Sequence, residues 1–345
     1  MKSALITGLT GQDGALLAQL LLSRGYRVVG TVRRPGSGNL WRLEELGILQ
    51  HERLSLATFD LLDADGARRL LDHAHPDEVY NLAAQSSASA SFDEPLLTLQ
   101  AAGAAPLQLL EGMRQLDPKI RFFQASSAEM FGQPPSAPQN EDTPLCPRTP
   151  YGAAKAYAHW MTLTYRDTYG MFGCSAILYN HESALRGREF VTRKITDAVA
   201  KIRLDKLDCL SLGRLDTRRD WGYAPDYVEA MHRMMQAGSP ATYVLATGRT
   251  LSIRDFASMA FRAADIEIEF RGVGPEESAV DRRSGRTVIR VDPTLYRPVE
   301  AEQLVGDASR ARTALGWEPS KTLDRICAEM VEADLRRNAA GASVK

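Results

Sequence analysis

The sequence predicts an α/β protein built on a doubly wound parallel sheet of the Rossmann type, followed by a smaller C-terminal lobe. Short apolar runs of strand length alternate with longer amphipathic runs through the first half of the chain, and such alternation is typical of right-handed strand–helix–strand units. A glycine-rich turn, Gly8 to Gly14, lies between the first of these strands and the first helix. A chain of 345 residues is long enough for two lobes.

The order of the elements leads to a division of the chain. Strands are expected at residues 3–7, 27–32, 54–59, 78–82, 120–124, 174–179 and 242–247. Helices are expected at 15–24, 63–74, 96–116, 226–237, 252–264, 308–315 and 321–337, with a further helix beginning near 151. We therefore predict a Rossmann domain of residues 1–179 and 216–248, a smaller lobe of residues 180–215 and 249–338, and a disordered tail at 339–345. Residues 271–286, rich in glycine and charge, are predicted to form a surface loop or lid.

Composition argues against several classes of partner. The net charge is −1 and charged residues make up 25% of the chain, so there is no basic excess to favour nucleic acid or an anionic membrane. Four scattered cysteines without CxxC spacing indicate neither a metal site nor a disulfide framework, which suits a reducing cytoplasm. The apolar run at the N-terminus is too short for a signal peptide, and no stretch reaches the length of a membrane span.

The glycine-rich turn predicts a dinucleotide site. Glycines after a strand let the backbone approach a pyrophosphate, whose charge then lies at the N-terminus of the following helix. The expected cofactor-binding residues of the turn are Gly8, Thr10, Gly11, Gln12, Asp13 and Gly14. The second strand ends in Arg33 and Arg34, where an NAD site would carry an acidic residue; guanidinium groups match a ribose 2′-phosphate, which predicts NADP unless the two arginines are simply solvated. Further contacts to the cofactor are expected from Asp60, Leu61, Leu82, Ala83, Ala84, Gln85 and Ser86.

A second group of residues carries candidate acid–base chemistry. Tyr151 and Lys155 are four residues apart and would share one face of a helix. A nearby ammonium lowers the pKa of a phenol, so Tyr151 could remove a proton from a sugar hydroxyl while a nicotinamide accepts the hydride. Ser127 and Glu129 follow the fifth strand into the same crevice, where a hydroxyl can bind a substrate oxygen and a carboxylate can act as a second base. Each feature alone is also compatible with solvated surface residues.

Together these motifs resemble the extended short-chain dehydrogenase/reductases, and within that class the GDP-mannose 4,6-dehydratase family. The resemblance covers about residues 2–337 in blocks that keep their order. In the first half the blocks are Gly8-Leu-Thr-Gly-Gln-Asp-Gly14, Arg33-Arg34, Asn81-Leu-Ala-Ala-Gln-Ser86, Ser127-Ala-Glu129 and the Tyr151 to Lys155 pair. In the second half they are Asn180-His-Glu-Ser183, Phe190-Val-Thr-Arg-Lys194, Arg219-Asp-Trp-Gly222, Asp226-Tyr-Val-Glu229, Tyr296-Arg-Pro298 and Leu315-Gly-Trp317.

The resemblance implies a hydro-lyase that acts on a nucleotide sugar with NADP. Tyr151 would take the proton of the sugar 4-hydroxyl, Lys155 would hold the nicotinamide ribose, and Glu129 would take the C5 proton before the 6-hydroxyl leaves as water. Ser127, where the family usually has threonine, would polarise the 4-keto oxygen. Cofactor contacts are implied for His181 and Arg186. Substrate contacts are expected from Ser86, Glu129, Asn180, Val191, Lys194, Arg219, Arg297 and Glu300, since cationic side chains suit a diphosphate.

Departures from the family pattern leave alternatives open. Besides Ser127, they are Ala128 for Ser, Phe131 for Tyr, Ala184 for Pro and His232 for Trp. Smaller residues near the sugar would allow the same dehydration of GDP-D-glycero-D-manno-heptose. An NADP-dependent reductase or epimerase would need no base at position 129, and a noncatalytic NADP-sensing protein would not need the Tyr/Lys pair. The resemblance also implies a homodimer or homotetramer, in which residues 33–39 could meet a neighbouring subunit.

Overall fold

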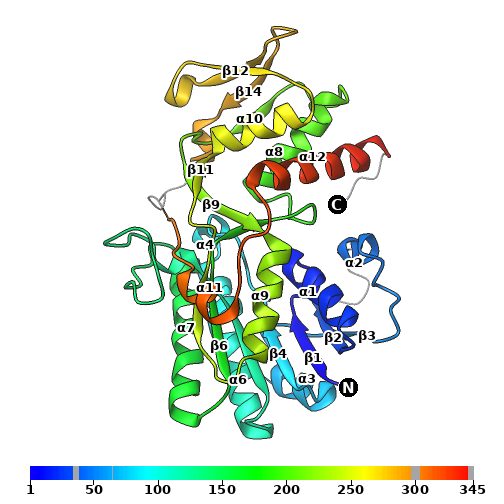
Figure 1. The fold of residues 1–345 in the computed structure, drawn as a ribbon, viewed down its shortest axis with the longest axis vertical. Coiled ribbons are helices and arrows are strands. Elements are labelled where there is room, and N and C mark those ends of the chain that lie inside the picture. The colour runs from blue at the N-terminus through cyan, green and yellow to red at the C-terminus, as the bar shows by residue number, and fades with distance from the viewer. Residues whose placement is uncertain (34–38, 64, 297–303, 341–345) are drawn as a thin grey trace.

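The computed structural model describes residues 1–33, 39–63, 65–296 and 304–340, and within them a large parallel sheet lies below a smaller lobe (Figure 1). The sheet has the strand order β10-β6-β5-β4-β1-β2-β3. Its strands are β1 (Ser3–Thr7), β2 (Arg27–Val32), β3 (Leu54–Thr58), β4 (Glu78–Asn81), β5 (Arg121–Ser127), β6 (Gly173–Leu178) and β10 (Thr242–Leu245). The predicted fold class is confirmed, and the order reverses at β1 and β4, where such sheets bind ligands beyond their carboxyl ends.

Helices cover both faces of this sheet. On one face α1 (Gln12–Ser23) packs against α9 (Ala224–Gln236) in a core that also contains Trp317. On the other face α3 (Gly66–Ala74) and α6 (Ala105–Leu116) pack together, and α7 (Pro150–Tyr169) adjoins α6. All five residues of β1 and all four of β4 are buried, as expected for central strands of a parallel sheet that helices cover on both faces.

The helix expected at residues 96–116 is interrupted. The chain forms α5 (Pro95–Leu99), then one π-helical segment (Gln100–Ala104), then α6. Pro106 lies at the start of α6, has no N–H to donate, and would clash with the carbonyl group one turn earlier in a regular α-helix. A π-helical turn is one way to absorb such a defect, so the chain continues in the same direction.

The smaller lobe is a mixed sheet covered by helices. Its strands, in the order β12-β13-β14-β8, are β12 (Ile268–Arg271), β13 (Ser278–Asp281), β14 (Thr287–Val291) and β8 (Leu210–Leu212). The helices that share its core are α8 (Val191–Arg203), α10 (Ile253–Ala263) and α12 (Leu323–Ala339). The prediction of a loop at residues 271–286 was wrong, because Ala279 and Val280 are buried and β13 pairs with both β12 and β14.

A third sheet joins the two parts. It consists of β7 (Asn180–Glu182), β9 (Arg218–Tyr223) and β11 (Thr250–Ser252) in the order β11-β9-β7. After it, α11 (Ser309–Leu315) contacts β10 and α9 of the large sheet. The predicted boundaries of the two domains stay a prediction. The remaining short helices are α2 (Trp41–Glu45), α4 (Ala90–Asp93), and the 3₁₀ turns Ala128–Met130, Gly274–Glu276 and Pro293–Leu295.

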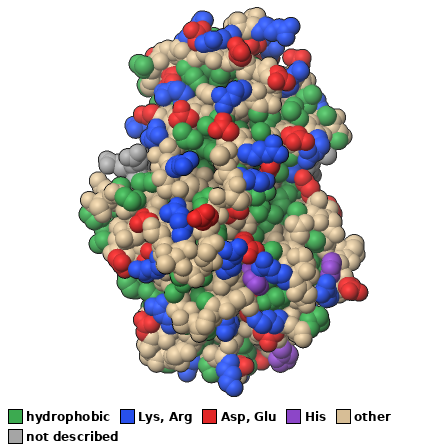
Figure 2. Space-filling model, viewed as in Figure 1, with side chains coloured by type: hydrophobic (Ala, Val, Ile, Leu, Met, Phe, Trp, Pro, Cys, Tyr) green, Lys and Arg blue, Asp and Glu red, His purple; other side chains and the backbone are tan. Residues whose placement is uncertain are grey.

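The surface agrees with the near-neutral composition. Lys and Arg side chains alternate with Asp and Glu over the face seen in Figure 2, without a broad field of one sign. All four cysteines are free thiols, and Cys174 and Cys327 are buried. Among the described residues no helix has the length and apolarity that a bilayer crossing requires, and no group of three or more His, Cys, Asp or Glu is arranged to hold a metal ion.

Candidate active site

The glycine turn brings backbone against backbone at the carboxyl end of β1. Gly8 has a φ of 74°, and a Cβ there would lie 2.9 Å from the Cα of Ala83. A Cβ on Gly14 would lie 2.2 Å from the Gly8 carbonyl oxygen. Helix α1 begins after Gly11 without a side-chain cap, so its first N–H groups are available to an anion. These glycines therefore form a cradle of the shape that a pyrophosphate needs.

The first turn of α1 is tied to the third sheet by a partly buried ion pair. Asp13 Oδ2 lies 2.8 Å from His181 Nε2, and His181 Nδ1 lies 2.7 Å from the Tyr179 carbonyl oxygen. Because both ring nitrogens face acceptors, this geometry favours the protonated ring of His181. Burial raises the pKa of Asp13, but the charge and hydrogen bond of His181, the charge of Arg186 and a hydrogen bond from Gln12 together outweigh it and lower that pKa to about 2. Burial lowers the pKa of His181, and the Asp13 carboxylate reverses this and raises it. The ring also stacks on Tyr227, with centroids 4.4 Å apart.

A cleft of about 860 Å³ runs along the glycine turn and the ends of β1, β2 and β4. Most residues predicted for the cofactor line it: Gly8, Thr10, Gly11, Gln12, Asp13, Gly14, Arg33, Asp60, Leu61, Leu82, Ala83, Ala84, Ser86 and Arg186. Gln85 does not line it, and its side-chain oxygen is buried without a hydrogen-bond partner. Lys155 and His181 line the adjoining cleft instead. Arg34 lies outside the described residues.

Several residues of this cleft were not foreseen. Trp41 and Arg42 of α2 and Arg193 of α8 also line it. Arg42 donates hydrogen bonds to the Thr10 carbonyl oxygen at 2.8 Å and to the Leu185 carbonyl oxygen at 2.6 Å. No spacing in the sequence identifies Arg42, because its two carbonyl partners lie 32 and 143 residues away.

Helix α7 presents Tyr151 and Lys155 to the second cleft. Thr149 caps the helix by accepting a hydrogen bond from the Gly152 N–H at 2.9 Å, and Pro150 occupies the first turn. One turn beyond Lys155, His159 Nδ1 lies 2.8 Å from Ser175 Oγ, which lies 2.9 Å from Ser126 Oγ. This buried contact joins α7 to β5 and β6 and thereby fixes the helix beneath the cleft.

Lys155 is held by a row of buried polar groups that crosses the sheet. Thr7 donates to the Asn81 side-chain oxygen at 2.8 Å, and Asn81 donates to Gln124 at 2.9 Å. Gln124 and the Lys155 ammonium both donate to the Ala125 carbonyl oxygen, at 3.1 and 2.8 Å. The ammonium is thereby held against β5, two residues before that strand ends.

The pKa of Tyr151 differs in direction from our expectation. Burial of its hydroxyl raises the pKa to about 12, while a hydrogen bond with Ser127 lowers it and the charge of Glu129 raises it. The Lys155 ammonium lies 5.8 Å from the Tyr151 ring centroid and donates to Ala125. Burial lowers the pKa of Lys155 to about 8, and Asp13 acts against this. The expected lowering of the Tyr151 pKa was wrong, because desolvation of the hydroxyl outweighs the neighbouring groups.

The second cleft, of about 410 Å³, brings the candidate acid–base residues together with most of the predicted substrate residues. Its lining includes Ser86, Ser127, Glu129, Tyr151, Lys155, Asn180, His181, Val191, Lys194 and Arg219. Ser127 accepts a hydrogen bond from the Glu129 N–H at 3.2 Å and so begins the turn that carries this glutamate. Arg214 also lines the cleft and was not predicted. Arg297 and Glu300 lie outside the described residues.

This sheet order, with a glycine turn before α1 and a Tyr/Lys pair on the helix after β5, defines an extended short-chain dehydrogenase/reductase. Solved structures share the fold. A dTDP-glucose 4,6-dehydratase of Bacillus anthracis in complex with NAD matches with a TM-score of 0.80 and 18% identity over 98% of each chain. RMD of Pseudomonas aeruginosa, complexed with NADPH, matches with a TM-score of 0.76 and 22% identity over 98% of this chain and 100% of that one.

Sequence comparison identifies the family. The family model described as GDP-mannose 4,6 dehydratase matches residues 5–330. A GDP-mannose 4,6-dehydratase of Yersinia enterocolitica is 46% identical over 352 residues, which cover 98% of this chain and 95% of that protein. The chain therefore belongs to the GDP-mannose 4,6-dehydratase family.

Proposed function

We propose that the protein is a hydro-lyase that converts GDP-D-mannose to GDP-4-dehydro-6-deoxy-D-mannose. The observation that carries the proposal is the presence of Tyr151, Ser127 and Glu129 in one cleft that adjoins the glycine-turn cleft. Family membership supports the substrate, because related proteins that cover nearly the whole chain carry this activity in their names.

Each acid–base residue has a proposed role. Tyr151 removes the proton of the sugar 4-hydroxyl, and Ser127 donates a hydrogen bond to the oxygen that becomes the 4-ketone. Glu129 then takes the C5 proton, which the new ketone makes acidic, and water leaves from C6. Lys155 holds the nicotinamide ribose. A carboxylate placed as a general base typically contributes a factor of about 10²–10⁴ to the rate, so Glu129 separates this function from that of a simple reductase.

We propose NADP as the cofactor; when bound it supplies the hydride acceptor for C4 and the hydride donor for C6. The cradle at Gly8 and Gly14 and the uncapped N-terminus of α1 suit its pyrophosphate. Arg33 lines the cleft at the end of β2, where a guanidinium favours a 2′-phosphate over a free hydroxyl. Proteins of similar fold have been solved with NADPH and with NAD. The proposal of NADP over NAD therefore depends on Arg33 at the end of β2.

We further propose that the protein is a homodimer formed through α5 and α7. On α7, Ala153, Tyr157, Trp160 and Thr164 are exposed at helical spacing without a charged residue among them. Leu96 of the adjoining helix α5 is 75% exposed, and Trp160 is 53% exposed. An uncharged stripe across two neighbouring helices suits an isologous interface with the same face of a second copy.

The test is incubation of the protein with GDP-mannose and NADP⁺ in heavy water. We expect loss of one water per sugar, one deuterium at C5, and no net NADPH. Accumulation of NADPH in proportion to substrate would indicate a dehydrogenase. If a parallel sample shows that only GDP-D-glycero-D-manno-heptose reacts, the proposed dehydration stands and the proposed substrate is wrong.

A further inference from the structure

Two buried arginines hold three successive carbonyl groups at the wall of the larger cleft. Arg193 donates to the carbonyl oxygens of Ala184 at 3.1 Å and Arg186 at 2.8 Å. Arg42 donates to the carbonyl oxygen between them, that of Leu185, at 2.6 Å. The chain then continues directly into residues 186–190, all of which line the cleft. The position of this wall is therefore set by guanidinium groups from two separate helices, α8 and α2.

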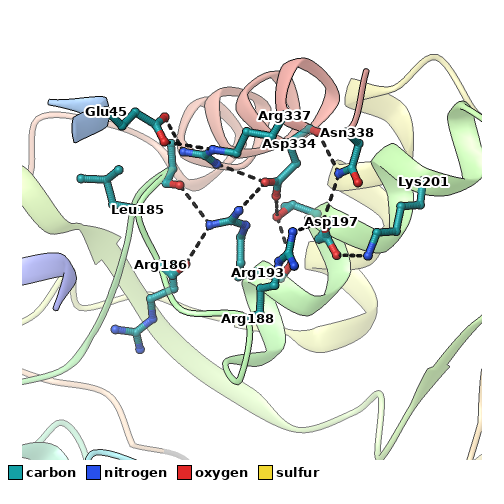
Figure 3. A network of polar contacts seen from close by, with 12 residues as sticks. Glu45, Leu185, Arg186, Arg188, Arg193, Asp197, Lys201, Asp334, Arg337 and Asn338 are labelled. Atoms are coloured by element: carbon teal, nitrogen blue, oxygen red, sulfur yellow. Dashed lines mark hydrogen bonds and ion pairs between the residues drawn. The ribbon is translucent and has the colours of Figure 1, made fainter. Parts of the chain in front are cut away.

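Helix α12 holds the first of these arginines. The Arg193 guanidinium lies 2.7 Å from Asp334, and both side chains are almost fully buried. Asp334 also accepts hydrogen bonds from Thr196 at 2.7 Å and Arg337 at 3.1 Å (Figure 3). The three partners hold the buried Asp334 carboxylate in one position, because removing any of them would leave part of its buried negative charge unpaired.

Arg337 completes a connection between the two lobes. Its guanidinium binds both carboxylate oxygens of Glu45 on α2, with Nε 3.1 Å from Oε2 (Figure 3). The Trp41 ring lies among three guanidinium groups, 4.5 Å from Arg42, 5.2 Å from Arg337 and 5.8 Å from Arg193. Arg42 also donates to the Thr10 carbonyl oxygen in the glycine turn. The contacts thus run from the C-terminal helix to α2 and on to both walls of the larger cleft.

We infer that Glu45 and Arg337 are positioning residues that slow cofactor release by linking α2, which lines the larger cleft, to α12. The inference rests on the proposed function. A bidentate pair between a carboxylate and a nearly buried arginine resists separation more than an exposed pair does. When the hydride taken from C4 returns to C6 of the same sugar, the cofactor need not leave between turnovers. Slow release therefore imposes no limit on the rate of the proposed reaction.

The experiment compares Glu45→Gln with the matched control Glu44→Gln, an exposed neighbour on the same helix. Bound NADPH is displaced by excess NADP⁺ in a stopped-flow instrument, and the release rate is followed by NADPH fluorescence without any sugar nucleotide. We expect Glu45→Gln to release NADPH about three to ten times faster than the unmodified protein, as for loss of a pair worth roughly 1 kcal/mol. The Kd for NADPH should rise with it, and Glu44→Gln should match the unmodified protein.

Hydrogen–deuterium exchange of the peptide spanning 184–190 provides the second measurement. Faster exchange there in Glu45→Gln, together with faster release, supports transmission through the cleft wall. An unchanged release rate, an equal effect of Glu44→Gln, or faster release without faster exchange of this peptide overturns the inference. Because binding is measured without GDP-mannose, failure of this inference is distinct from failure of the proposed dehydration.

Discussion

The backbone of Gly152 lies directly against that of Glu129. A Cβ at position 152 would be 2.5 Å from the Glu129 carbonyl oxygen and 3.2 Å from its carbonyl carbon. This close approach lets the first turn of α7, which carries Tyr151, pack on the 3₁₀ turn that carries Glu129. The two proposed bases are therefore positioned by one backbone contact.

Gly152→Ala should disturb both stability and activity. The added methyl group meets a backbone atom, so α7 or the 3₁₀ turn must shift, and overpacking of this kind costs about 1–3 kcal/mol. Thermal unfolding and the rate of dehydration measure the two effects. Gly238→Ala is the control, since nothing lies within 4 Å of a Cβ there. Equal unfolding temperatures for the two variants would contradict the argument.

Glu129→Gln should separate the two halves of the proposed reaction. The amide keeps the size of the side chain but cannot take the C5 proton, so we expect dehydration to slow by about 10²–10⁴. Oxidation at C4 depends on Tyr151 and should persist. The measurement is a single-turnover experiment that follows nicotinamide absorbance at 340 nm together with deuterium at C5. Dehydration at the unmodified rate would show instead that Glu129 is not the base that takes the C5 proton.

Ser127→Ala should weaken proton removal by Tyr151. The hydrogen bond with Ser127 lowers the Tyr151 pKa, which burial raises. Its loss should raise that pKa further, and the limb of the pH–rate profile on which the rate rises with pH should move to higher pH. We expect a loss of activity of about 10–100-fold, as for one lost hydrogen bond to a charged group. Ser127→Thr keeps the hydroxyl and should retain most of the activity. If both variants have the same rate, the hydroxyl has no such role.

The sequence allowed the sheet and the glycine turn to be predicted because both depend on local patterns. The strands were located to within three residues because their apolar runs are bounded by turn residues. Arg42 was not predicted as a cleft residue because its carbonyl partner, Leu185, is distant in the sequence. Arg193 was not predicted because no residue spacing indicates that its side chain turns back to the Arg186 carbonyl group. The predicted direction of the Tyr151 pKa shift was wrong, because the burial that raises this pKa depends on how the whole chain packs.

The Asp13–His181 pair should stabilise the folded protein at intermediate pH, and this stabilisation should be lost at both ends of the pH range. The pKa of Asp13 is lowered to about 2 from its ordinary value near 3.8, so its contribution is present above pH 3.8 and lost as the pH falls through 2. The pKa of His181 is raised, so its contribution is full below 6.5 and lost as the pH rises through the raised value.

His181→Gln should remove the loss of stability that accompanies deprotonation of His181 at high pH. We expect the unmodified protein to lose more stability than the variant between pH 6 and pH 9, measured by thermal unfolding at each pH. His73→Gln is the control on an exposed histidine. Parallel curves for His181→Gln and the unmodified protein would show that the ion pair does not titrate as argued.

Trp160→Glu tests the proposed dimer. A carboxylate in the uncharged stripe of α7 would face its own copy across a twofold interface, and burying two like charges is strongly unfavourable. We expect the variant to be a monomer by light scattering coupled to size exclusion, at a concentration where the unmodified protein is a dimer. Gln19→Glu, at an exposed position of α1 on the other face of the large sheet, should leave the dimer intact. A monomeric mass for the unmodified protein would end the proposal, whereas a dimer that survives Trp160→Glu would place the interface on another face.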